Sequence, residues 1–321
     1  MSWEWPVVIY LWLAGLAGGA YFVAFLANLF SGGKYHAAKR VAAALGVPAV
    51  ILGVLMLVFE LGHPFRAWHL FVRFRFISPM SLGSWLLLLW AVLATVLFVI
   101  WWSDTATAKR MNGTRGKIVG FLRKLRPAAG VLDWLAFILA ILLIAYTGVL
   151  LSAGSPALWS STFLLPALFV ASAVATGIAI LNLAGALGIS EVNRDLMGKL
   201  CKAGAVVCTV EILALAGLLL LTATSPSASV VYAAEGSLQA QEAAYTLSTT
   251  QALNTLLTGP MSFAFWVGVV LVGLVLPLGV ELAMILRGVE KPGREIALVL
   301  ALMVLAGGLI LRAVVVFGGQ V

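Results

Sequence analysis

Eight long apolar stretches are the feature of this sequence that most constrains its fold. A helix needs about 20 consecutive apolar residues to cross the hydrocarbon core of a bilayer. Of the 321 residues, 63% are hydrophobic and 10% are charged, whereas a soluble domain usually carries about 25% charged residues. We therefore predict an all-α integral membrane protein with eight transmembrane helices. The apolar stretches fall at about 5–30, 41–61, 82–102, 127–152, 162–187, 200–224, 260–286 and 295–317.

The fourth and fifth stretches are separated only by a turn signal. The run from Trp134 to Ser190 contains no charged residue and is too long to form one transmembrane helix. Gly154 and Pro156 lie within this run, and this pair of residue types marks a turn. Because the resulting number of helices is even, both termini are expected on the same side of the membrane.

The basic residues predict the orientation of these helices. Sixteen of the 20 Lys and Arg residues follow the first, third, fifth and seventh stretches, whereas Arg66, Arg73 and Arg75 lie on the opposite side and Arg312 lies inside the last stretch. Lys and Arg concentrate in cytoplasmic loops. We therefore expect a bacterial cytoplasmic membrane protein with both termini on the outer, periplasmic side. The net charge of +8 then reflects topology, and nucleic acid is not an expected partner.

The cysteines and histidines limit which cofactors the protein could hold. Cys201 and Cys208 form no C-x-x-C motif, which argues against an iron–sulfur cluster in this protein. His36, His63 and His69 fall in loops or at helix ends, whereas a membrane-embedded haem needs axial ligands inside the helix bundle. We therefore expect no haem, no iron–sulfur cluster and no other metal site. Quinone is then the electron carrier that the sequence could hold, and a partner would bring the metal centres.

Three polar residues are predicted near the outer ends of three helices. Tyr10 lies about 8 Å below the outer end of the first helix, and Tyr146 lies about 9 Å below that of the fourth. Glu60 lies at the outer end of the second helix. Quinone oxygens need hydrogen-bond donors, and a nearby carboxylate can exchange the accompanying protons. We predict a quinone site of Tyr10, Tyr146 and Glu60, with His63 assisting in proton exchange. The alternative is that the tyrosines anchor their helices at the interface and Glu60 faces water.

Other ionisable residues are predicted at membrane depth, where charge is costly and usually functional. Glu211 lies near the middle of the sixth stretch, and Arg312 lies in the eighth. These two residues either form a structural ion pair or take part in a proton relay. Asp133 and Asn28 lie in the inner halves of their helices. We predict a proton route that includes Asp133, Asn28 and Glu211.

The predicted outer loop at 62–81 differs from the other outer loops, which contain no Lys or Arg. It is rich in arginine and aromatic residues and lacks acidic residues, a composition typical of protein-binding surfaces. We predict that it docks a partner protein; the alternative is an amphipathic stretch anchored to lipid head groups. The residues of this predicted docking surface are Arg66, Trp68, His69, Arg73 and Arg75.

Several short segments carry a family resemblance through their order and spacing. Together they cover the first five predicted helices, whereas the last two helices match mainly in hydropathy. The segments are GLAGGAYF at 15–22, ELGHPFRAWH at 60–69, SPMSLGSW at 78–85, AYTGVLL at 145–151, PALW at 156–159 and LPALF at 165–169. In these segments the protein resembles the NrfD-like family, the integral membrane subunits of polysulfide-reductase-type respiratory complexes.

This resemblance implies more than composition does. It implies two four-helix bundles, here residues 1–152 and 153–321, with a quinone of the menaquinone or ubiquinone type bound near the outer face of the first; the second bundle would contain a long periplasmic loop at about 225–259. It also implies a partner subunit with four iron–sulfur clusters, often with a molybdopterin catalytic subunit. Tyr146 matches the family's quinone-binding tyrosine, Glu60 matches an acidic position, and Tyr10 replaces a quinone-binding histidine.

The prediction is therefore a quinone-binding membrane anchor of a respiratory oxidoreductase complex. It would pass electrons and protons between an outer-leaflet quinol and the iron–sulfur partner, while the substrate site would lie in another subunit; proton translocation would be a further property. The first alternative is a secondary transporter that uses Glu211, Arg312 and Glu281, for which helix breaks near Pro277 and Gly307 would be a sign. The second is a structural anchor without quinone.

Overall fold

The computed structural model describes most of the predicted membrane-spanning part of the protein. Within the described residues the fold is almost entirely helical and contains no strand, which confirms the predicted helical class. The described residues are 3–60, 79–103, 124, 126–152, 164–189, 191–224, 251–289 and 291–320.

Eight helices in this part of the protein are long and apolar enough to cross a membrane, as predicted. The seventh span consists of a π-helix followed directly by an α-helix, and a short 3-10 turn, η2 (Arg126–Ala128), precedes the fourth. The spans are α1 (Trp5–Phe30), α2 (His36–Glu60), α4 (Pro79–Trp102), α7 (Ala129–Ser152), α9 (Leu164–Ala186), α10 (Arg194–Thr224), η3 (Ala264–Val275) with α12 (Leu276–Leu286), and α13 (Arg294–Gly318).

Two helices begin five or more residues earlier than the hydropathy pattern predicts. α2 begins at His36 rather than near residue 41, and α10 begins at Arg194 rather than near residue 200. Lys39 and Lys199 therefore belong to helices and not to loops. The physical reason is that a lysine can lay its apolar stem along a helix while its ammonium reaches a polar partner or the interface. A hydropathy average therefore places the start of the span too late at such residues.

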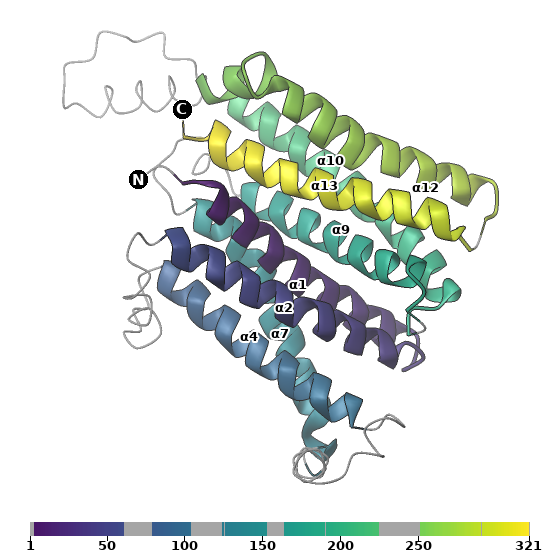
Figure 1. Cartoon of the computed structure of the whole chain (residues 1–321). Coiled ribbons are helices and arrows are strands. Elements are labelled where there is room, and N and C mark those ends of the chain that lie inside the picture. Colours follow the sequence, from purple (N-terminus) through teal and green to yellow (C-terminus); the bar gives the residue numbers. More distant parts are fainter. Residues whose placement is uncertain are drawn as a thin grey trace.

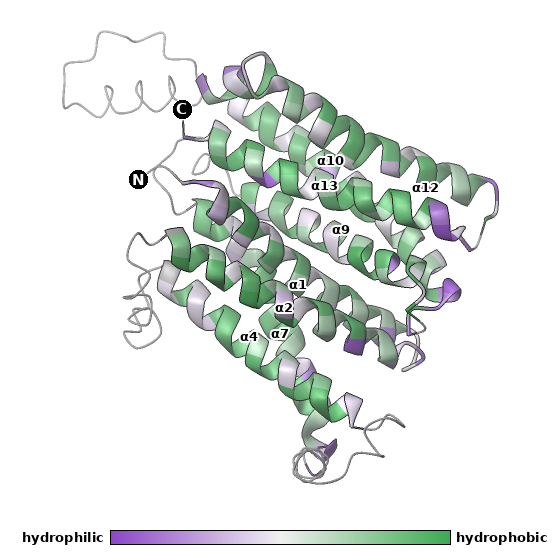
Figure 2. Ribbon diagram, viewed as in Figure 1, coloured by the Kyte–Doolittle hydropathy of each residue, from purple (hydrophilic) through white to green (hydrophobic). Residues whose placement is uncertain are grey.

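The outer surface of the helices is suited to lipid. Large apolar side chains along the spans are exposed, such as Leu213 on α10 (66% exposed). Hydrophilic residues gather at the helix ends, mainly at the end away from the two chain termini (Figure 2). This distribution agrees with a protein that crosses a bilayer and is most strongly charged on one side.

The two ends of the protein are held together on one side of the helices (Figure 1). The Gln320 side chain accepts a hydrogen bond from the Trp3 amide at 2.6 Å and donates one to the Trp3 carbonyl at 3.0 Å. The rings of Trp5 and Phe317 pack edge to face, with centroids 5.2 Å apart. The termini therefore share one side, as an even number of spans requires. Their periplasmic location stays a prediction.

The helices contact one another in two groups that share an extensive interface. α1, α2, α4 and α7 contact one another in a ring, and so do α9, α10, α13 and the pair η3–α12. α9 also packs against α1 and α7, and α1 packs against α13. Because α9 contacts both groups extensively, the predicted division between residues 152 and 153 stays a prediction.

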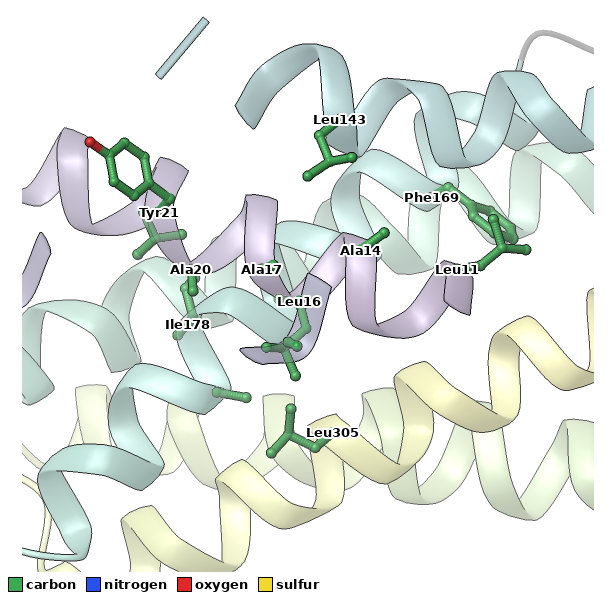
Figure 3. Close-up of a cluster of buried hydrophobic side chains, with 14 of the residues drawn as sticks. Leu11, Ala14, Leu16, Ala17, Ala20, Tyr21, Leu143, Phe169, Ile178 and Leu305 are labelled. Atoms are coloured by element: carbon green, nitrogen blue, oxygen red, sulfur yellow. The ribbon is translucent and has the colours of Figure 1, made fainter. Parts of the chain in front are cut away.

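Glycines bring the backbones of α1 and α9 into direct contact. A Cβ atom on Gly19 would lie 1.9 Å from the carbonyl oxygen of Ala173, and one on Gly177 would lie 2.2 Å from the carbonyl carbon of Gly19. Small residues allow this close approach between membrane helices. Buried apolar side chains of α1, α9 and α13 surround the contact, including Ile178 and Leu305 (Figure 3).

We expect Gly177→Val to destabilise the protein strongly. Its side chain would overlap backbone atoms of α1 that cannot move aside, and overpacking of this kind costs about 3 kcal/mol. The thermal unfolding midpoint of the purified protein in detergent should therefore fall. Gly279→Val on α12 is the matched control, because a Cβ there meets nothing within 4 Å. Equal midpoints for the two variants would contradict a tight α1–α9 contact.

Candidate functional site

Tyr10 and Tyr146 come together between the first and fourth spans. Tyr10 on α1 is fully buried and Tyr146 on α7 is 7% exposed. Their side chains are close enough to interact with one another. Tyr10 also packs against Gly53 of α2, whose added Cβ would lie 3.6 Å from the Tyr10 ring. The predicted pair is thus assembled from helices that are distant in sequence.

Gly83 of α4 forms the surface beneath the phenol of Tyr146. A Cβ on Gly83 would lie 1.9 Å from Cζ and 2.0 Å from the hydroxyl oxygen of Tyr146. Only glycine therefore leaves room for the phenol at this place. The Tyr10 hydroxyl has no hydrogen-bond partner within the described residues although it is buried. A buried hydroxyl in this state is available to a ligand oxygen.

The remaining predicted quinone-site residues lie at the edge of the described structure or beyond it. α2 ends at Glu60, seven residues after Gly53, which corresponds to about 10 Å along the helix axis from the level of Tyr10. The helix thus ends on the same side as the tyrosine pair. His63 lies outside the described residues, as do the predicted docking residues Arg66, Trp68, His69, Arg73 and Arg75.

Asp133 forms a buried cluster with two residues from neighbouring helices. One carboxylate oxygen accepts a hydrogen bond from the Tyr21 hydroxyl of α1 at 2.8 Å, and the other pairs with the Lys39 ammonium of α2. The ammonium also lies over the ring of Trp101, 5.1 Å from its centroid. The side chains of Lys39 and Asp133 are 3% and 13% exposed. This cluster ties α1, α2 and α7 together.

Two further polar residues of the first half lie near the end of α1 and at the start of α2. Asn28 is partly buried, and its side-chain oxygen has no hydrogen-bond partner in the described part of the protein. His36, at the first turn of α2, packs edge to face against Trp101 with centroids 5.2 Å apart. The predicted link between Asp133 and Asn28 stays a prediction.

Arg312 and Glu211 face each other across a serine rather than in a direct ion pair. Arg312 of α13 is fully buried and donates hydrogen bonds to the Ser172 hydroxyl at 3.2 Å and the Gly308 carbonyl at 2.7 Å. The Ser172 side chain on α9 also interacts with the buried Glu211 carboxyl of α10. The guanidinium lies over the ring of Phe169, 5.5 Å from its centroid. Two of its nitrogens, Nε and Nη2, lack partners among the described residues.

Two small cavities continue from this cluster through the second half of the protein. One, of about 10 Å³, is lined by Glu211, Ser172 and Gly308, among others. The second, of the same size, is lined by Glu281 and Asn182, and both cavities share Ala175 and Val304 in their walls. A polar cavity of this size accommodates one water molecule. Polar groups therefore follow one another from Arg312 to Glu281.

The paired glycines of α13 serve close packing rather than a helix break. α13 runs without interruption from Arg294 to Gly318. A Cβ on Gly307 would lie 2.2 Å from the Cα of Gly273 in η3, and one on Gly308 would lie 2.6 Å from Thr176 of α9. The transporter interpretation takes Gly307 as a candidate break, and the structure corrects that expectation. The seventh span changes from π to α winding just before Pro277 but remains helical.

Four residues of these clusters have no predicted role, although Tyr21 and Gly83 lie within the segments that resemble the NrfD-like family. A single tyrosine or serine, such as Tyr21 or Ser172, changes the average hydropathy of a membrane span too little to be noticed. The sequence alone does not distinguish Gly83 from other glycines in helices. Lys39 carries a usable signal, because a carboxylate such as Asp133 at membrane depth needs a cation nearby. A lysine at the start of the adjacent span satisfies that need. Among the described residues, no group of three His, Cys, Asp or Glu side chains could hold a metal ion.

The fold and these clusters define a multi-pass membrane protein with polar sites buried between its helices. The family described as "Polysulphide reductase, NrfD" matches residues 1–321. The protein therefore belongs to the NrfD family, and the resemblance carried by the short segments is confirmed.

Individual relatives agree with this assignment over different parts of the sequence. A polysulfide reductase polypeptide of Wolinella succinogenes is 31% identical over 326 residues, covering 99% of this sequence and 94% of that protein. Protein NrfD of Escherichia coli is 35% identical over 196 residues, and the match spans 58% of this sequence but only 60% of that protein. A selenate reductase subunit of Mesobacillus selenatarsenatis is 26% identical over 129 residues, covering 39% of this sequence and 29% of that protein.

We expect Asp133→Asn to destabilise the fold. The change leaves the Lys39 ammonium buried without its counter-ion, and breaking a buried ion pair in this way costs about 3–5 kcal/mol. Thermal unfolding in detergent would show the loss as a lower midpoint. The double variant Lys39→Met with Asp133→Leu removes both charges and should recover most of the stability. An Asp133→Asn variant of full stability would contradict a structural role for this pair.

Proposed function

We propose that this protein is the quinone-binding membrane subunit of a reductase complex. The family, together with relatives named as components of polysulfide and selenate reductases, supports a membrane subunit of such a complex. The observation that carries the quinone part is the buried pair Tyr10 and Tyr146, with a hydroxyl that lacks a partner in the described residues. A quinone bound there would exchange two electrons and two protons as it passes between its oxidised and reduced forms.

The residues present fit the head group of a quinone. Two phenol hydroxyls from α1 and α7 can donate hydrogen bonds to ring oxygens, and Gly83 leaves the room that the phenol of Tyr146 occupies. The tyrosines orient the head group and keep it within a water-poor region. Glu60 and His63, at and after the end of α2, would exchange protons with the outer aqueous phase. Menaquinone and ubiquinone both present the ring oxygens that this arrangement requires.

The electrons would leave through a partner with its own metal centres. Cys201 and Cys208 are free and buried in α10, and the described histidine, His36, packs on Trp101. We propose a four-cluster iron–sulfur subunit docked on the 62–81 segment, with a molybdopterin catalytic subunit behind it. The arginines of that segment would meet acidic groups of the partner.

We also propose that turnover is coupled to proton movement through the second half of the protein. Glu211, Ser172 and Arg312 form a buried polar cluster that two water-sized cavities extend toward Glu281. Glu211 would pass protons along this series of groups. Asn28 and Asp133 would contribute from the first half, although Asp133 is also held in its pair with Lys39.

We expect Tyr146→Phe to lower quinol-linked turnover of the assembled complex. Loss of one hydrogen bond to the ring costs about 1.4 kcal/mol, or roughly tenfold in affinity. Gly83→Ala should have a similar or larger effect, since its Cβ displaces the phenol of Tyr146. Turnover with an artificial dye donor that bypasses this subunit should stay unchanged in both variants. Gly130→Ala on α7 is the matched control, because its Cβ meets no neighbour within 4 Å. Wild-type quinol turnover in Tyr146→Phe and Gly83→Ala would support a structural anchor without quinone.

We expect Glu211→Gln to separate electron transfer from proton movement. In proteoliposomes containing the whole complex, quinol-linked turnover should persist while proton uptake from the inside falls about tenfold or more, because an amide cannot carry a proton. Glu295→Gln, at an exposed carboxylate of α13, is the control. Unchanged uptake in Glu211→Gln would remove Glu211 from the route.

The transporter alternative uses Glu211, Arg312 and Glu281 as a substrate or ion site. Their burial around two small cavities is the observation that favours it. The unbroken α13 and the family membership favour the reductase subunit instead. A transporter would move its substrate across a vesicle membrane without any electron donor, so uptake by the purified protein alone would establish it.

A further inference from the structure

A wide groove lies between α1 and α10 on the surface of α9. Both helices pack against α9 but make little contact with each other. The space that remains between them has a volume of about 390 Å³. Ile178 of α9 lies at its floor, Phe22 and Leu26 line it from α1, and Ala203 and Val207 line it from α10. Neither Tyr10 nor Tyr146 lines this groove.

The groove is apolar along its length and polar at one end. Its polar lining residues are Ser31, Tyr35 and Lys199, which all lie at the helix ends away from the chain termini. From Lys199 to Val207 the wall extends for eight residues of α10, or about 12 Å. One leaflet of the hydrocarbon core is about 15 Å thick. The groove thus has the length and the polarity profile of one lipid chain with its head group.

The charges at the polar end favour an anionic head group. Asp195 is already engaged, since its carboxylate accepts hydrogen bonds from Lys34 at 2.6 Å and from the Tyr35 hydroxyl at 2.5 Å. The bond from Asp195 also raises the pKa of the Lys34 ammonium, so that lysine remains charged. Lys199 lies over the Tyr35 ring, 5.1 Å from its centroid, and forms no salt bridge within the described residues. The Asp195 carboxylate attracts this ammonium without forming a direct ion pair with it among the described residues, so the ammonium can still contact an anionic ligand.

The side of the membrane fits the same ligand. This end of the helices is the one that the basic residues predict to be cytoplasmic. Basic pockets between transmembrane helices on that side recognise phosphate-bearing lipid head groups. We propose that the groove binds one anionic phospholipid, with its phosphate beside Lys199 and one acyl chain along α9. The lipid would fill the space between α1 and the second half of the protein.

Lipid retention by the full-length protein tests this assignment. The purified protein is delipidated in detergent and titrated with phosphatidylglycerol or phosphatidylcholine, and bound lipid is counted by native mass spectrometry. We expect one tightly retained phosphatidylglycerol and weaker retention of phosphatidylcholine. Lys199→Gln should weaken phosphatidylglycerol binding about fivefold without changing phosphatidylcholine binding. Lys202→Gln, an exposed lysine of α10 that does not line the groove, should leave both unchanged.

A second pair of variants tests the groove itself. Ala203→Phe would fill it and should abolish retention of the tight lipid, whereas Val206→Phe, on an exposed position outside the groove, should not.

Equal losses of phosphatidylglycerol binding in Lys199→Gln and Lys202→Gln would overturn the proposal in favour of diffuse surface charge. Full retention in Ala203→Phe would place the lipid elsewhere. If the purified protein instead retained a quinone, and Ala203→Phe no longer retained that quinone, the groove would be a quinone site and the phospholipid proposal would be wrong. Tyr146→Phe should retain the lipid normally, which separates this proposal from the proposed function.

Discussion

The backbone contact between α1 and α9 is the constraint on which the other features depend. Gly19 and Gly177 leave no space for a side chain on either helix, and this fixes both the depth and the rotation of α1. Tyr10 and Tyr21 lie eleven residues apart, about three helical turns, and so project from nearly the same face. That face meets α7, where Tyr10 reaches Tyr146 and Tyr21 reaches Asp133. A different face of α1 carries Gly15, which lies against the guanidinium of Arg312. A rotation of α1 would therefore disturb both polar clusters together.

The spans could be predicted from the sequence because the bilayer acts on every residue of a long apolar stretch. The partners of buried polar groups could not, because each depends on a single contact between helices far apart in the sequence. Depth along the helix brings Tyr10 and Tyr146 to the same level, and the structure places them side by side. The same reasoning misses Lys39, whose charge suggests a loop although the residue lies inside α2 and pairs with Asp133. For Glu211 and Arg312 it leaves an ion pair and a proton relay open, and it does not indicate Ser172, which bonds Arg312 and interacts with Glu211.

The roles of individual glycines also could not be predicted from the sequence alone. In the sequence, Gly307 and Gly308 are compatible with a broken helix or with close packing, since glycine permits both. The contacts with Gly273 and Thr176 decide for packing, and α13 stays intact. Gly83 has no special signal in the sequence, and its role is to leave room for the phenol of Tyr146. The role of a membrane glycine is thus determined by its neighbour on the next helix.

The buried polar groups divide according to whether their hydrogen bonds are satisfied. Each carboxylate oxygen of Asp133 has a donor, and the Lys39 ammonium has both a counter-ion and an aromatic face. A cluster so completed stabilises the fold and has little capacity left for a ligand. The Tyr10 hydroxyl, Nε and Nη2 of Arg312 and one oxygen of Glu281 lack partners within the described residues. Leaving such groups unpaired costs free energy, so their retention is better explained by use than by stability. Under the proposed function, Tyr10 serves the quinone at one end of α1, while Arg312 serves proton movement in the second half. Gly15 of α1 packs against the guanidinium of Arg312 on α13, so the helix that carries Tyr10 also contacts the second cluster.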